Sequence, residues 1–120
     1  MLDTTKIRIR NCLDANGKPA GGNAVVTTQV NSGDAMGYLA EVVRVSFQDG
    51  PILDAHGRNG AFVEDLLWIA LKRIEFYNAA GFACDENTEA LRHIDDALAA
   101  LGRRTARRVA QGVEGTHKGN

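Results

Sequence analysis

The chain has 120 residues, of which 44% are hydrophobic and 24% charged, a composition typical of a single soluble globular domain. Its formal net charge of −1 argues against a general DNA- or RNA-binding protein, because such proteins carry a positive excess that neutralises many phosphates. The sequence contains no run of about 18 apolar residues, the length needed to span a membrane, and no apolar signal-peptide core before the first strand. With two isolated cysteines, Cys12 and Cys84, these features predict a cytoplasmic protein with reduced thiols.

Three segments of the first half have the composition and alternation of β-strands. We predict strands over residues 6–10, 24–30 and 38–47. In the first of them Ile7 and Ile9 face one side and basic residues face the other. Residues 14–23 combine Asn-Gly, Pro and Gly-Gly turn signals, and residues 52–55 are a candidate short fourth strand. Short connections between consecutive strands favour an antiparallel sheet over residues 1–60.

At residue 61 the hydrophobic period changes from two to about 3.6, which indicates helices. The first helical pattern, over 61–80, places five residues on one stripe: Val63, Leu67, Ala70, Ile74 and Tyr77. Gly81 predicts its end. The second pattern runs from 83 to about 110, with a pairing seam of Leu91, Ile94, Leu98 and Leu101. The expected fold is α+β: a small N-terminal antiparallel β-sheet followed by a C-terminal two-helix hairpin over 61–120, in one compact domain.

The end of the second helix carries an arginine cluster, which consists of Arg103, Arg104, Arg107 and Arg108. One interpretation is a solvated helix end, because cations near a helix C-terminus complement the macrodipole. However, Arg104 and Arg108 lie four apart on one face, as do Arg103 and Arg107, and no acidic residue occupies the position four before any of them. Planar guanidinium groups suit phosphate oxygens. In a nearly neutral protein, this cluster predicts a site for a small phosphate-bearing ligand.

Aromatic and amide side chains gather at the opposite end of the hairpin. Tyr77 or Phe82 could stack on a base, and Asn87 could pair with a base edge or a ribose hydroxyl. The structural alternatives are that Phe82 packs inside the hairpin turn and that Asn87 is simply a polar residue of a first helical turn. Asn87 and Arg104 are separated by 17 positions, or roughly 25 Å of helix, so one chain cannot bring both to a small ligand. If two hairpins pack antiparallel, Asn87 and Tyr77 of one copy approach Arg104 and Arg108 of the other, which predicts a homodimer with pockets at its interface.

The sequence contains no recognisable catalytic or metal-binding set, so we expect no cofactor and no enzyme activity. The three histidines have no metal-ligand spacing: His56, His93 and His117. Adjacent Asp95 and Asp96 diverge by about 100° on a helix and are poorly placed to share one task. Two alternatives stay open. An enzyme degrading the same ligand would use Glu114, the acid that follows the arginines, and a small nucleic-acid or protein interaction module would use the basic helix end.

Several motifs resemble the phage anti-Thoeris sponge family, which shares its helical hairpin with anti-CBASS sponges of cyclic oligonucleotides. The motifs are "SFQDGPI" (46–52), an "NG" before the first helix, "GFACDEN" (81–87) and "ALAALGRRTARRVAQGVEGTHK" (97–118). The resemblance covers about residues 43–118. The arrangement of Phe-Ala-Cys-x-Glu-Asn upstream of Arg-Thr-x-x-Arg and Gly-Val-Glu-Gly-Thr is specific.

The resemblance implies a phage immune-evasion protein that binds glycocyclic ADP-ribose, the messenger of Thoeris TIR enzymes, and holds it uncleaved. Some family members also bind cyclic di- or trinucleotides at a separate site. It further implies a dimer, or a higher assembly such as a hexamer, in the cytoplasm of the infected bacterium. The near-neutral charge and the lack of a long apolar run predict no membrane, DNA or RNA partner. By motif, the ligand-contacting positions are Tyr77, Asn87, Arg104 and Arg108. Phe82, Arg103 and Arg107 are the secondary candidates from the residue patterns.

Overall fold

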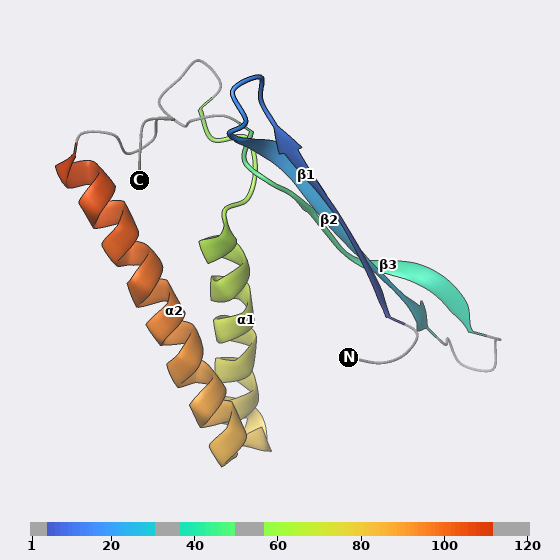
Figure 1. The fold of residues 1–120 in the computed structure, drawn as a ribbon. Coiled ribbons are helices and arrows are strands. Elements are labelled where there is room, and N and C mark those ends of the chain that lie inside the picture. Colours follow the sequence, from blue (N-terminus) through green and yellow to red (C-terminus); the bar gives the residue numbers. More distant parts are fainter. Residues whose placement is uncertain (1–4, 31–36, 50–56, 112–120) are drawn as a thin grey trace. The chain divides into compact units, whose positions relative to one another are not determined.

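The structure is a computed structural model that describes residues 5–30, 37–49 and 57–111. The chain divides into two units, Met1–Ala61 and Phe62–Asn120, and each is described by itself. Figure 1 shows a twisted β-meander in the first unit and a helical hairpin in the second. The expected α+β class, with an N-terminal antiparallel sheet followed by two helices, is confirmed.

The first unit contains one antiparallel sheet in the strand order β1-β2-β3. Its strands are β1 (Lys6–Leu13), β2 (Pro19–Val30) and β3 (Tyr38–Ser46). The prediction that residues 14–23 form only a turn is wrong, since β2 already begins at Pro19. The turn itself is short, and the Asp14 carboxylate closes it by accepting hydrogen bonds from the backbone N–H groups of Asn16 (2.8 Å) and Lys18 (3.0 Å).

The Gly-Gly pair belongs to β2 because it allows a close approach of two backbones. Gly22 has a φ of 126°, and a Cβ there would lie 2.0 Å from the carbonyl oxygen of Arg10 in β1. A Gly-Gly signal therefore marked an irregular strand pairing and not a loop. The candidate fourth strand, residues 52–55, lies outside the described residues.

The two faces of the sheet differ in chemistry, because directly paired residues of an antiparallel sheet point to the same side. The apolar face contains Ile7, Ile9, Val26, Val43 and Val45. The basic face contains Lys6, Arg8, Arg10 and Arg44, together with Glu41. Arg44 and Glu41 form a bidentate ion pair, in which Nε donates to Oε2 at 2.9 Å. On the basic face Val25 lies between Arg8 and Arg44 in the register and is 8% exposed, which fits coverage by their aliphatic stems.

The segment before the first helix is held by two side chains with amide groups. Gln48 accepts from the N–H groups of Asn59 (2.9 Å) and Gly60 (3.1 Å) and donates to the carbonyl of Gly57 (2.7 Å). Asn59 in turn accepts from the N–H of Asp49 and donates to its carbonyl, both at 2.8 Å. A Cβ on Gly60 would lie 2.6 Å from the carbonyl carbon of Phe47. The "SFQDGPI" and "NG" motifs thus contain a reciprocal side-chain to backbone brace.

The second unit is a helical hairpin. Its elements are α1 (Val63–Tyr77), a π-helical turn η1 (Asn78–Phe82) and α2 (Asp85–Ala110). At the start of α1 the Asp65 carboxylate accepts the Phe62 N–H at 2.8 Å, which satisfies a donor that has no intrahelical partner. The chain turns at Gly81, whose φ of 95° favours glycine, so the predicted end of the first helix region is confirmed.

The face that α1 turns toward α2 differs from the predicted stripe. Leu71 is 5% exposed, and Leu67 and Ile74 are partly buried, so these three residues form the inner stripe. The predicted stripe is confirmed at Leu67 and Ile74 and wrong at its other three residues, since Val63 (56%), Tyr77 (39%) and Ala70 are exposed. The apolar surface of α1 is wide enough that spacing alone does not select the packed side. The α2 seam is confirmed, because all four of its predicted residues are partly buried.

Within the described part of the chain, no helix has the length and apolar content needed to cross a membrane. The same residues contain no group of three or more side chains placed to hold a metal ion.

Candidate ligand-binding site

Tyr77 ends α1 beside two other large side chains. Its ring lies 6.2 Å from that of Phe76, centroid to centroid, at an interplanar angle of 55°. The Arg73 guanidinium lies 4.9 Å from the Tyr77 ring centroid, and its Nε donates to the Tyr77 hydroxyl at 3.2 Å. The ring is 39% exposed. The structure therefore gives the predicted stacking aromatic an exposed ring with a defined orientation.

Asn87 lies in the first turn of α2 and is partly buried. Its Nδ2 donates to the Phe82 carbonyl oxygen at 3.1 Å, and its backbone N–H donates to Cys84 Sγ at 3.4 Å. Within the described residues its Oδ1 has no hydrogen-bond partner. The side chain is thus anchored through its nitrogen, and its oxygen is left as an acceptor.

The Phe82 side chain is 71% exposed, so the alternative that it packs inside the hairpin turn is wrong for the described hairpin. Its backbone nevertheless takes part in the turn through the Asn87 amide. Tyr77, Phe82 and Asn87 all lie at the end of the hairpin formed by η1, as predicted. The π-helical turn is a local departure from α-helical geometry, of a kind often found at functional sites.

The arginine cluster lies in the part of α2 that extends beyond α1. The helix α2 has 26 residues and α1 has 15, a difference of about 16 Å of helix. Figure 1 shows the C-terminal end of α2 past the first turn of α1. Arg103, Arg104 and Arg107 are exposed, and none forms an ion pair with a described residue. They present three unneutralised guanidinium groups within two turns.

Arg108 differs from the other three arginines. Its side chain is 6% exposed, so the expectation that Arg104 and Arg108 both lie at an exposed helix end is correct for Arg104 and wrong for Arg108. Their spacing of four still places them on neighbouring turns of one face. A buried guanidinium must have partners, so Arg108 packs within this helix end in addition to contributing positive charge to it.

One chain does not bring the two groups of residues together. Asn87 and Arg104 belong to the same unbroken helix, 17 positions apart, or roughly 25 Å. The structure thus agrees with the distance inferred from the sequence. The hairpin thus has an aromatic ring and an amide acceptor at its turn end and exposed cations at its opposite end.

The other polar residues of α2 form local pairs. Arg92 Nη1 lies 3.8 Å from Asp96 Oδ2, and His93 Nε2 lies 3.5 Å from Glu89 Oε1, all with exposed side chains. Such pairs are typical of a solvated helix face. Glu114, the candidate acid of the enzyme alternative, lies outside the described residues.

Sequence reasoning missed Arg73. Its contacts with Phe76 at i+3 and Tyr77 at i+4 follow from helical neighbour geometry, and that spacing was the available signal.

These elements define a small α+β protein built on a helical hairpin with an aromatic-amide end and a basic end. A family model for the Acb2/Tad1 hairpin domain matches residues 40–106. Thoeris anti-defense 1 of Bacillus phage SBSphiJ7 is 40% identical to this chain over 98 residues. The chain therefore belongs to the Acb2/Tad1 hairpin family, which confirms the resemblance found in the sequence. The match covers 82% of this chain and 64% of the phage relative, so the chain spans less than two thirds of that protein's length.

Proposed function

We propose that this is a phage-type immune-evasion protein that binds and sequesters, without cleaving it, a cyclic nucleotide messenger of bacterial defence. The expected ligand is glycocyclic ADP-ribose, produced by Thoeris TIR enzymes in the host cytoplasm. The observation that carries the proposal is the group of three exposed arginines without an ion pair among the described residues. Guanidinium forks in this state suit a pyrophosphate, and a relative of this chain bears the name Thoeris anti-defense 1.

Each end of the hairpin supplies a different part of the recognition. Arg104 donates to phosphate oxygens, with Arg103 and Arg107 adding positive potential, and Arg108, which is 6% exposed, contributes to the same face while it supports the helix end. The Tyr77 ring stacks on the base, for which its 39% exposure leaves room. Asn87 accepts from a base edge or a ribose hydroxyl through Oδ1, while Nδ2 stays bonded to the Phe82 carbonyl.

The ligand pocket in this proposal is shared between two copies of the chain. Because Asn87 and Arg104 are roughly 25 Å apart on one helix, the turn end of one hairpin must meet the arginine end of another. An antiparallel pair related by a two-fold axis forms two equivalent pockets. Such dimers could assemble further, for example into hexamers. Gly102 adjoins the arginines, and a Cβ there meets nothing within 4 Å in the described chain, so its face is open to a second copy.

Sequestration requires affinity and slow release but no chemistry. The arginine side chains stabilise bound phosphates without providing a general base, and Tyr77 and Asn87 act by stacking and hydrogen bonding. The enzyme alternative needs an acid–base group beside the pyrophosphate, for which Glu114 is the candidate.

A capture-and-release experiment tests the proposal. The purified protein is incubated with TIR-produced glycocyclic ADP-ribose, freed of unbound ligand, heat-denatured and analysed by chromatography. Recovery of intact messenger in proportion to protein supports sequestration. A shortened product would identify an enzyme, and Glu114→Gln should then abolish turnover while keeping binding.

If nothing is captured, glycocyclic ADP-ribose is not the ligand, and the next probes are cyclic di- and trinucleotides. Retention of DNA or RNA that falls with salt would favour the interaction-module alternative. Arg92→Ala is the matched control for the arginine variants, because Arg92 lies on α2 outside the cluster and pairs with Asp96.

A further inference from the structure

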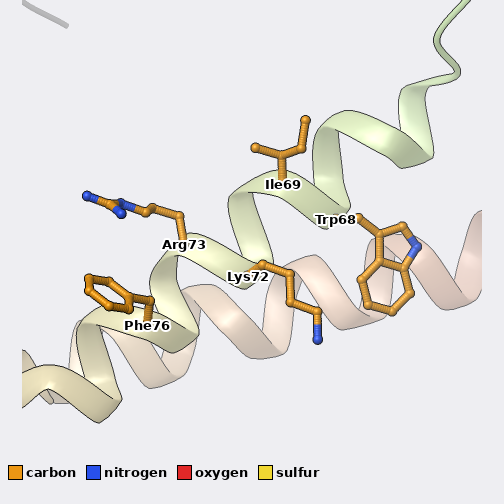
Figure 2. A pocket seen from close by; sticks show the side chains of 5 residues that line it. All are labelled: Trp68, Ile69, Lys72, Arg73 and Phe76. Carbon is orange, nitrogen blue, oxygen red and sulfur yellow. The ribbon is translucent and has the colours of Figure 1, made fainter.

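Arg73 lies against two aromatic rings at the end of α1. Its guanidinium carbon lies 5.0 Å from the Phe76 ring centroid and 4.9 Å from that of Tyr77. Both distances fall within the range of attractive cation–π contacts. Figure 2 shows Arg73 and Phe76 side by side on α1, with the guanidinium near the ring. The Nε donates to the Tyr77 hydroxyl as well, so Arg73 holds Tyr77 by two different interactions.

No carboxylate of the described chain competes for this guanidinium. The neighbouring Glu75 pairs with Lys72 instead, Nζ to Oε1 at 3.5 Å, and the Lys72 ammonium lies 5.8 Å from the Trp68 ring centroid. Among the described residues, the partners of the Arg73 guanidinium are therefore the two rings and the phenol oxygen. The adjacent cations Lys72 and Arg73 thus contact different aromatic rings. Of these rings, only that of Tyr77, a partner of Arg73, belongs to the proposed ligand site.

We propose that Arg73 is a positioning residue that fixes the plane of the Tyr77 ring for stacking against the ligand's base. This inference rests on the proposed function. An exposed tyrosine at a helix end rotates about two side-chain bonds, and ordering such a side chain on binding lowers affinity. The hydrogen bond to the hydroxyl and the cation on one ring face restrict both rotations before the ligand arrives. The base stacks on the opposite face of the ring.

The proposal predicts a coupling between Arg73 and Tyr77 that a direct phosphate contact would not produce. Arg73→Lys keeps the charge but removes the planar fork and its Nε donor. Tyr77→Phe keeps the ring but removes the hydroxyl. Each change should weaken messenger binding by about three- to tenfold, the range expected for ordering one side chain. The double variant should bind no more weakly than the weaker single variant, because both changes remove the same restraint.

The test is a double-mutant cycle measured by calorimetry with glycocyclic ADP-ribose at two salt concentrations. Lys72→Gln is the matched control, since Lys72 is the neighbouring cation and its ammonium lies by the Trp68 ring and Glu75. The control should bind with an affinity close to that of the wild type. Arg73→Gln, which removes the charge, should show the same dependence of affinity on salt as Lys72→Gln, because neither cation contacts a phosphate. Helical circular dichroism checks that every variant folds.

Three results would overturn the inference while the wild type still captures the messenger. They are unchanged binding by Arg73→Lys, losses that multiply in the double variant, or a weaker salt dependence in Arg73→Gln than in Lys72→Gln, which would make Arg73 a direct phosphate contact. If the wild type captures no messenger, the proposed function fails, and the positioning role fails with it.

Discussion

The strongest test of the proposed site compares two arginines that lie one helical turn apart. Arg104 is exposed and has no ion pair with a described residue, so Arg104→Ala should change the free energy of unfolding by less than about 0.5 kcal/mol. A hydrogen bond to a charged group contributes about 1.5–3 kcal/mol, so loss of its phosphate contact should weaken messenger binding by about 10- to 150-fold.

Arg108 should respond differently because its side chain is 6% exposed. Truncation at this position removes a buried charged group from its partners and leaves them unsatisfied, which costs about 1–3 kcal/mol of folding free energy. Arg108→Ala should therefore lower the urea midpoint as well as the affinity. The two substitutions separate a ligand contact from a contact that also supports the helix end.

Isothermal titration calorimetry with the messenger measures affinity, and urea unfolding followed by circular dichroism measures stability. Arg92→Ala should leave binding unchanged, since the Arg92–Asp96 pair lies outside the cluster. Arg104 is not a ligand contact if Arg104→Ala binds the messenger as tightly as the wild type, and it is a structural residue if Arg104→Ala unfolds as readily as Arg108→Ala.

Three further predictions concern the fold. Leu71→Ala should lower the unfolding free energy by about 2–5 kcal/mol, whereas Ile69→Ala, on a side chain that is 67% exposed, should cost much less; equal urea midpoints would mean that the inner stripe of α1 is misassigned. Gly102→Ala should stabilise α2 by about 1 kcal/mol and raise the melting temperature, since a Cβ there meets nothing within 4 Å; a lower melting temperature would contradict this. The hydrogen bond from Arg44 lowers the pKa of Glu41 below its ordinary value. The ion pair therefore stabilises the fold at pH values above the ordinary pKa, and this stability is lost as the pH falls through the lowered pKa. Glu41→Gln should flatten the dependence of unfolding on pH in this window, and an unchanged acid profile would show that the pair contributes nothing.

The sequence predicted the elements well where one periodicity dominated. Strict alternation located β1, and the α2 seam followed from leucine and isoleucine at spacings of three and four. It failed at the Gly-Gly pair, because the role of Gly22 depends on the proximity of the Arg10 carbonyl in another strand. It also missed Leu71 and included the exposed Val63 and Tyr77 in the stripe of α1, since apolar residues occur around most of that helix and tertiary contacts decide which of them are buried.

The site was predictable to a similar extent. Spacing grouped the arginines and gave the distance to Asn87, because both quantities are properties of one helix. Burial of Arg108 was not predictable, since it depends on what packs against the helix end. The role of Asn87 Nδ2 in holding the turn also required coordinates, because the acceptor is a backbone carbonyl.

The unlike faces of the sheet should give this protein two opposite responses to salt. Attraction of the basic face to an anionic resin acts over about 10 Å at 0.1 M ionic strength and fades as salt is added. Contacts of the apolar face, where Ile7 is 47% and Ile9 60% exposed, strengthen in sulfate, which is excluded from protein surfaces. Chromatography on a cation exchanger and on a phenyl resin can therefore report which of the two faces an assembly has covered.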